Sequence, residues 1–167
     1  NTLLDGSFLF RSSGFTSLPP DMTLAALKDG THMFRSNDLT SLPSGMALAA
    51  LESGSNMFFA NALTSLPSGM TLDALTDGGN MFRNNPTLTT VPADFAQNSD
   101  CTSWGDAFSN TNLTQTSIDN ILTNLDARGT SNGKFDQSGG SAPSATGEAA
   151  IDNMRGRGWT INVTGGY

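Results

Sequence analysis

The stretch LTSLPSGM occurs twice in this chain, at residues 39–46 and 63–70, with all eight letters identical and a step of 24 positions. Phenylalanines keep the same step around it. They are Phe10, Phe34, Phe58 and Phe82, and Phe108 follows with a step of 26. Self-similarity at a fixed period is typical of repeat proteins, in which each unit buries its apolar face against the next. The two copies therefore predict stacked units.

Further positions follow this frame and complete a predicted structural ladder beside the five phenylalanines. Its other members are Leu18, Leu42, Leu66 and Val91, each before a proline, and Asn37, Asn61 and Asn85. A side-chain amide at the Asn position can bond the backbone of its own turn and of the turn above. Such a ladder predicts one spine of apolar side chains along the stack.

The local pattern predicts a helix and a strand in each unit. Met46, Leu48 and Leu51 have spacings that place apolar groups on one side of a short helix, and Gly54 stands just past its end. The piece 63–66 is too short for an independent strand, so it requires copies alongside; we expect Leu66 in the core and Leu63 at the entering turn. The predicted fold class is an α/β solenoid, leucine-rich-repeat-like, of ~24-residue repeats, each with a short parallel β-strand and a short helix.

The repeats are predicted over residues 1–116, with a partial first unit and irregular last units. The frame breaks at Pro86, and Gln97 and Asp100 then replace the helix leucines. The chain does not begin with Met, and its first residues fit the middle of a repeat. We therefore expect a piece of a longer protein or a removed leader, and an upstream segment or a partner covering the N-terminal half-repeat.

Residues 117–167 are predicted to form a C-terminal helix-helix-strand cap. Ser117 is the expected N-cap of a first helix that ends at Gly129, and residues 134–135 suggest a short strand. A second helix is expected at about 144–157. The alternation over 159–163 then predicts a strand.

Charge and hydropathy exclude several classes of partner. The net charge is −7 with eight Lys and Arg, so clustered basic groups for nucleic acid or anionic lipid are missing. No apolar run approaches the ~20 residues of a membrane span. Hydrophobic residues still make up 37% and recur regularly, which predicts a folded chain.

The run M-F-x-x-N-x-L-T-S-L-P over 33–43 resembles the BspA-like leucine-rich repeats of bacterial surface proteins, with Asn37 where that family often has Cys. The closing stretch, with ILTNLDARG (121–129), SNGKF (131–135) and RGWTIN (157–162), looks like a C-terminal module of phage virion and bacterial surface proteins. The resemblance implies adhesion or structural display at a virion or an extracellular cell surface. The implied partners are a protein or a surface glycan, and other virion or surface subunits.

Three hypotheses about function follow. The first is a non-enzymatic module of a phage particle, which decorates the capsid or forms a fibre or receptor-binding part. The second is the C-terminal part of a bacterial cell-surface adhesin. The third is an enzyme such as a glycan hydrolase; no motif supports it, and we expect no catalytic residue, metal or cofactor.

Two rows of side chains are candidates for binding. The first is a hydroxyl-rich row, which presents a flat face to a sugar, a protein or ice, or else reflects β-propensity and backbone bonding alone. Its members are Thr16, Ser17, Thr40, Ser41, Thr64, Ser65, Thr89, Thr90, Thr114 and Gln115. Arg11, Arg35 and Arg83 form the second row, with Phe59 in the gap; they contact an acidic partner or pack on the surface.

The remaining chemistry-bearing residues have ordinary structural interpretations. His32 stands where later units have Asn56 and Asn80, which indicates a polar surface position. Cys101 is either a reactive thiol or a small buried residue. The Asp-Gly pairs fit helix-end turns better than calcium loops. The carboxylate pairs Asp119 with Asp126 and Glu148 with Asp152 fit a solvated helix face better than acid–base catalysis.

Overall fold

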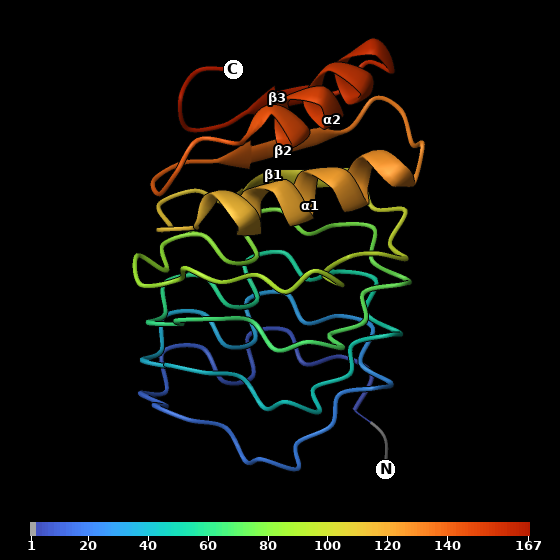
Figure 1. Ribbon diagram of the computed structural model, residues 1–167. Coiled ribbons are helices and arrows are strands. Elements are labelled where there is room, and N and C mark those ends of the chain that lie inside the picture. Colours follow the sequence, from blue (N-terminus) through green and yellow to red (C-terminus); the bar gives the residue numbers. More distant parts are fainter. Residues whose placement is uncertain (1–2) are drawn as a thin grey trace.

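All helices and strands of the computed structural model, which describes residues 3–167, follow residue 102 (Figure 1). In chain order they are β1 (Ser103–Phe108), α1 (Gln115–Ala127), β2 (Lys134–Gln137), α2 (Ala145–Gly156) and β3 (Thr160–Asn162). The strands form one parallel sheet in the order β1-β2-β3, and a helix connects each parallel pair. Parallel neighbours need such crossovers, because a tight turn reverses the chain direction.

The predicted fold class, an α/β solenoid with a strand and a helix in every repeat, is wrong. Residues 3–102 contain no helix and no strand, only isolated bridges such as Asp29↔Ser53 and Ser65↔Thr90. Met46 N donates to Pro43 O and Leu51 N donates to Leu48 O, which makes two separate turns. A helix requires successive bonds to the fourth preceding residue. The spacing of the apolar residues therefore predicts which side chains face the core, but not the secondary structure. Separate turns bury these side chains as well as a helix would.

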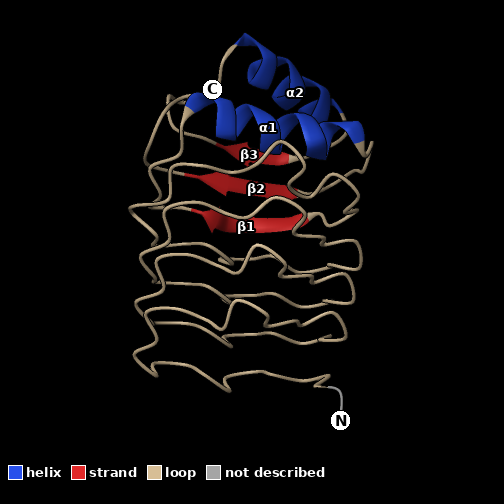
Figure 2. Cartoon of the chain, turned by 60° about the horizontal axis from the view of Figure 1, so that its bottom comes forward, coloured by secondary structure: helices blue, strands red, loops and turns tan. Residues whose placement is uncertain are grey.

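Residues 6–102 pass around the core in four circuits, which we call layers: 6–29, 30–53, 54–77 and 78–102. Neighbouring layers run in the same direction and lie side by side (Figure 2). Backbone hydrogen bonds join residues of one layer to those of the next, for example Phe10 N to Met33 O at 3.0 Å and Phe34 N to Met57 O at 3.0 Å. The fourth layer continues onto β1 in the same way, through Phe82 N to Ala107 O.

On one side of every layer, all backbone hydrogen bonds to the next layer have the same direction. We call this side the aligned strip (residues 6–12, 30–36, 54–60 and 78–84). Two residues per layer have positive φ there, between 52° and 59°: Phe8 and Ser12, His32 and Ser36, Asn56 and Ala60, and Asn80 and Asn84. Each bond between layers of the strip runs from an N–H of one layer to a carbonyl of the next. The strip therefore directs N–H groups toward the C-terminal end and carbonyl groups toward the N-terminal end.

A column of phenylalanine rings runs through the core. Ring centroids are 5.7 Å apart for both Phe34–Phe58 and Phe58–Phe82, with interplanar angles of 4° and 7°. Phe10 lies at one end of the column, and Phe108 continues it at the other, 5.3 Å from Phe82. Beside the rings, Leu42, Leu66 and Val91 are buried and Leu18 is half-buried. Leu63, which was expected at the entering turn while Leu66 faced the core, is fully buried together with Leu66.

Glycine at the start of each layer leaves room for a side chain of the following layer. A Cβ placed on Gly30 would lie 2.9 Å from Met57 Sδ, and one on Gly78 would lie 2.7 Å from the Trp104 ring. Both distances are below any normal contact between carbon and its neighbours. A side chain at either position would force Met57 or Trp104 to move, so glycine here permits close packing between layers.

Buried asparagines connect the layers through their side-chain amides. Asn61 Nδ2 donates to Phe34 O and Phe58 O at 3.0 and 3.1 Å, and Asn61 Oδ1 accepts from Leu39 N at 3.1 Å. Asn37 and Asn85 make equivalent bonds one layer away on either side. The amides of Asn61 and Asn85 thus satisfy backbone groups that water cannot reach.

The C-terminal segment closes the stack, with one correction to the predicted elements. The N-cap of α1 is Thr114, whose Oγ1 accepts from Ser117 N at 3.3 Å, and not Ser117 as predicted. Ser117 is buried, and its Oγ donates to Thr89 O and accepts from Val91 N. The Ser117 hydroxyl is therefore used in hydrogen bonds to the fourth layer and does not cap the helix.

The sheet also crosses the predicted boundary between repeats and cap. β1 lies before residue 116, yet it pairs with β2, which lies after that boundary.

Candidate binding surfaces

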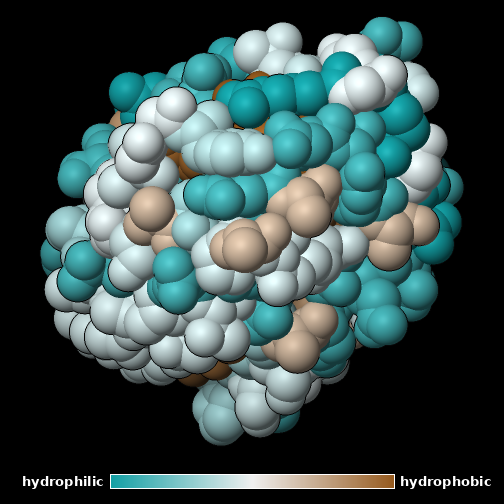
Figure 3. Space-filling view, turned by 45° about the horizontal axis from the view of Figure 1, so that its top comes forward, coloured by the Kyte–Doolittle hydropathy of each residue, from teal (hydrophilic) through white to brown (hydrophobic). Residues whose placement is uncertain are grey.

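The N-terminal end of the stack exposes apolar side chains. Leu9 is 53% exposed, whereas Met33, one layer above it, is fully buried. Of the six exposed large hydrophobic residues within positions 3–167, five belong to the first layer or the residues just before it. They are Leu3, Leu4, Phe8, Leu9 and Phe15. The opposite end, by contrast, is covered by α1 and α2 and is mostly hydrophilic or neutral on its surface (Figure 3).

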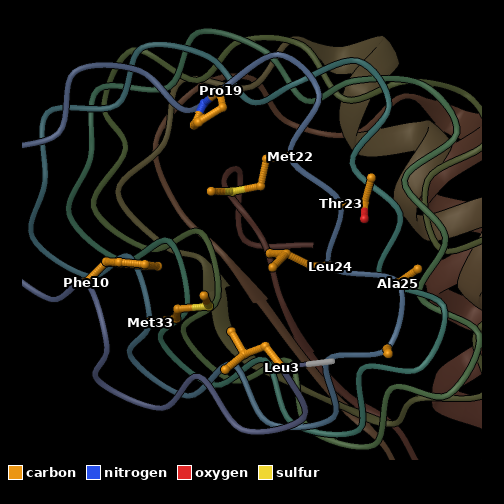
Figure 4. Close-up of a pocket in the computed structure, with 9 residues that line it drawn as sticks. Leu3, Phe10, Pro19, Met22, Thr23, Leu24, Ala25 and Met33 are labelled. Carbon is orange, nitrogen blue, oxygen red and sulfur yellow. The ribbon is translucent and has the colours of Figure 1, made fainter. Parts of the chain in front are cut away.

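This open end is hollowed. A cavity of about 530 Å³ is lined by Leu3, Phe10, Met22, Leu24 and Met33 among others, and their side chains point to the middle of the first layer (Figure 4). A second hollow of about 190 Å³ is also lined by Phe10 and Met22, together with Phe15 and Phe34. That an upstream segment or a partner covers this end remains a prediction. The surface to be covered is apolar.

Three of the exposed residues at the open end, Leu4, Phe8 and Phe15, were not singled out from the sequence. Leu4 stands in the frame of Lys28 and Glu52, and Phe8 stands in the frame of His32 and Asn56. The sequence did contain a signal for this apolar rim. At both positions the first layer has an apolar residue where later layers have a polar one. Together they extend the apolar surface of the open end onto its rim.

The predicted hydroxyl-rich row lies along one side of the layers. Nine of its ten members are exposed, and Thr89 is half-buried. The backbone connects the threonines in order, with Thr64 N donating to Thr40 O at 3.2 Å and Thr89 N donating to Thr64 O at 3.0 Å. The structure thus brings the row together as one surface, which we call the hydroxyl face.

Only part of the hydroxyl face is occupied by bonds to the protein itself. Thr64 Oγ1 and Thr89 Oγ1 donate to backbone carbonyls of the preceding layer, and Thr114 caps α1. Gln115 Nε2 donates to Ala142 O. Among residues 3–167, five hydroxyls of the face make no hydrogen bond to protein. They belong to Thr16, Ser17, Thr40, Ser41 and Ser65, and they are available to a ligand.

The arginine row is occupied by contacts within the chain. The Arg35 guanidinium lies over the Phe59 ring at 4.4 Å, Arg11 lies over Phe8 at 5.9 Å, and Arg83 Nη1 lies 3.5 Å from Asp106 Oδ2. His32 stacks on Phe8 with centroids 4.7 Å apart. Burial, and then the charges of the neighbouring arginines, lower the pKa of the His32 imidazole. These contacts favour the packing interpretation.

Three of the four carboxylates considered for catalysis are engaged by other groups of the chain. Asp119 accepts from Ser144 N and Oγ at the start of α2, and Asp126 forms an ion pair with Arg157 at 2.7 Å. Asp152 accepts from the Tyr167 hydroxyl. No group of three or more His, Cys, Asp or Glu side chains suited to a metal ion occurs within the described range, and no helix there is long and apolar enough to cross a membrane.

Cys101 is buried, and burial raises the pKa of its thiol to about 11. Because the thiolate is the reactive form, we expect native protein at pH 8 to react with a disulfide reagent such as DTNB at least 100-fold more slowly than unfolded protein. Absorbance of the released thiolate, with and without denaturant, measures both rates. Equal rates would instead identify Cys101 as an accessible, reactive thiol.

Comparison of the chain with protein-family models, curated proteins and solved structures finds no match. The resemblance to BspA-like repeats and to the C-terminal module remains a prediction from the residues of 33–43 and 121–162. The surfaces described above therefore provide the basis for a proposal about function.

Proposed function

We propose that this chain is a non-enzymatic recognition module displayed on a surface, most directly on a phage virion as a capsid decoration or fibre part. The observation that carries the proposal is the hydroxyl face, a largely exposed row that follows the four layers from Thr16 and continues to Gln115 at the start of α1. Hydroxyls on a rigid scaffold at regular steps suit hydrogen bonding to a surface glycan or to the backbone of a protein.

The arrangement of the ends is consistent with display. The C-terminal end is closed by α1 and α2, while the N-terminal end presents apolar side chains that water solvates poorly. Attachment through the open end leaves the hydroxyl face free along the side of the molecule. The net charge of −7 supports solubility of the displayed part.

Substitution of the free hydroxyls tests the proposal. We expect Thr40→Ala, Ser41→Ala and Ser65→Ala together to weaken binding to isolated envelopes of the host bacterium at least about tenfold, because each lost hydrogen bond is worth about 0.5–1.5 kcal/mol. Ser44→Ala with Ser68→Ala is the matched control, since both residues are exposed and lie outside the row. Equal binding by both variants and wild type would refute recognition through this face.

The site of display is measured separately. Quantitative mass spectrometry of purified virions is expected to find the chain at a fixed copy number per particle. If it is instead released by protease treatment of intact bacterial cells and is absent from particles, the chain is part of a cell-surface adhesin. Absence from both would refute surface display.

A further inference from the structure

We propose that the outward side of the aligned strip carries a binding site for an acidic segment of a partner protein. Its residues, which we call the arginine patch, are Phe8, Arg11, His32, Arg35 and Phe59. They come from the first three layers, and each of the two guanidinium groups holds one carboxylate of the partner. The inference goes beyond the proposed function, because the patch contains no residue of the hydroxyl face and does not depend on what that face binds.

The two arginines of the patch carry charges that the chain itself does not neutralise. The sequence has 15 acidic residues and eight Lys and Arg, and five of these eight form ion pairs within residues 3–167. A sixth, Arg155, donates to two backbone carbonyls. Over the same range, Arg11 and Arg35 have neither kind of partner. In a chain with an excess of acidic groups, they form a local basic surface at the same position of neighbouring layers.

Stacking holds the two guanidinium groups in place without using up their N–H groups. Arg35 lies over the Phe59 ring at 4.4 Å, and Arg11 lies over the Phe8 ring at 5.9 Å. A ring contacts the flat face of a guanidinium, whereas its five N–H groups lie in its plane. The packing of these arginines on the surface is therefore compatible with binding, because it orients their N–H groups for a ligand.

Most of these N–H groups have no partner. Within residues 3–167, the Arg11 side chain donates no hydrogen bond, and the Arg35 side chain donates one, from Nη1 to His32 at 3.2 Å. Arg35 Nε is buried and also lacks a partner. A carboxylate therefore binds Arg35 end-on, through Nη1 and Nη2. Such paired, charge-assisted hydrogen bonds are stronger than neutral ones.

His32 adds a third donor to the patch. A guanidinium only donates hydrogen bonds, so His32 Nδ1 accepts the bond from Arg35. The proton of the imidazole is therefore on Nε2, which has no hydrogen-bond partner in the described part of the chain. Stacking on Phe8, with ring centroids 4.7 Å apart, fixes the orientation of the imidazole. The polar side-chain atoms of the patch that remain available are thus all donors.

Donors without acceptors, beside aromatic rings, fit the carboxylates of a protein better than a glycan. The hydroxyls of a sugar bring donors that need acceptors, and the side chains of the patch have no acceptor left. Arginine and aromatic residues are the types enriched in protein–protein interfaces. Phe8 is 52% exposed and Phe59 is half-buried, so both rings offer apolar surface beside the guanidinium groups. An extended acidic segment with alternate carboxylates on one face matches this arrangement.

The position of the patch favours a partner over a preceding segment of this chain or a second copy. Each layer adds one outward side chain to a row along the stack, and Arg35 and Phe59 follow Arg11 in this way. A preceding layer in the same frame would therefore lengthen the row and leave the patch uncovered. The net charge of −7 opposes association of two copies.

The test uses the chain of residues 1–167 and the peptide Gly-Ser-Glu-Ser-Glu-Ser-Gly, whose glutamates lie on one face about 7 Å apart when the peptide is extended. Side-chain NMR signals of arginine and histidine follow a titration at low ionic strength, where screening is weakest. We expect saturable shifts of the Arg11, His32 and Arg35 signals. A peptide with Gln in place of both Glu is expected to bind at least about tenfold more weakly.

Variants of the protein test which charges bind. Arg11→Ala and Arg35→Ala are each expected to weaken binding at least about fivefold. Arg35→Lys keeps the charge but loses the planar fork, so it is expected to weaken binding at least about threefold. Arg83→Ala is the matched control, because Arg83 belongs to the same row but is paired with Asp106 at 3.5 Å. We expect this variant to bind within about twofold of wild type. Circular dichroism shows that all four variants are folded.

Five outcomes would overturn the proposal. They include absence of saturable shifts, equal binding of the Glu and Gln peptides, and an equal effect of Arg83→Ala, which would indicate diffuse attraction to positive charge. Tighter binding of a glucuronic acid oligomer than of the peptide would favour an acidic glycan instead. A dimer in sedimentation that Arg35→Ala dissociates would favour a second copy.

Discussion

Replacement of Asn85 by alanine is expected to lower the free energy of unfolding by about 4 kcal/mol, because it leaves buried backbone groups without partners. Asn85 is fully buried. Its Nδ2 donates to Phe58 O and Phe82 O at 3.0 and 2.9 Å, and its Oδ1 accepts from Leu63 N at 3.2 Å. Without the amide, Leu63 N–H and Phe82 O are unpaired in a site closed to water, at about 1–3 kcal/mol each.

Asn37 provides the control for this prediction. It makes the same kind of bonds, but two of its partners, Ser13 N and Phe15 N, belong to exposed residues at the open end. Water can replace the lost amide there, so Asn37→Ala is expected to cost about half as much. Urea denaturation followed by circular dichroism measures both free energies. Equal losses would show that the position in the stack does not control the effect.

The second large effect is expected for Phe58→Ala, which removes a ring from the middle of the aromatic column. Removal of a buried phenylalanine costs about 3–5 kcal/mol, and each aromatic neighbour adds about 0.5–1.5 kcal/mol. Phe58 is fully buried and stacks on Phe34 and Phe82, both at 5.7 Å. We therefore expect a total near 5 kcal/mol and a melting temperature lower by about 10–20 °C.

Phe10→Ala is the matched substitution at the end of the column. Phe10 is half-buried and stacks on one buried ring, Phe34, at 5.6 Å. It also borders the open cavity, so water fills the space that its ring leaves. We expect a loss of less than about 2 kcal/mol. Calorimetry of the two variants compares them directly, and a larger loss for Phe10→Ala would contradict the stacking argument.

Which residues lie beside one another was readable from the sequence, because equal spacing in a stacked chain places equal positions in contact. Phe34, Phe58 and Phe82 are an example, and so are the threonines of the hydroxyl face. The class of secondary structure was not readable. The spacing of Met46, Leu48 and Leu51 is compatible with a helix and with separate turns, and turns bury the same three side chains.

Other features depend on backbone conformations that composition does not reveal. His32 and Ser36 have positive φ, and so do Asn56 and Ala60 at the same positions of the next layer. These residue types have little in common except their position in the layer. β1 was missed because Ser103–Phe108 contains Gly105 and Asp106, which are poor strand residues. Its pairing with β2 is made by contacts distant in sequence.

The stacking of layers also determines how the molecule responds to force. Each inner layer is held by neighbours on both sides, whereas the first layer is held on one side and the last is buttressed by α1 and α2. A pull on the N-terminus therefore detaches the chain one circuit at a time, and each release lengthens it by about 80 Å. Any contact that holds the first layer in place therefore also prevents this stepwise detachment of the layers.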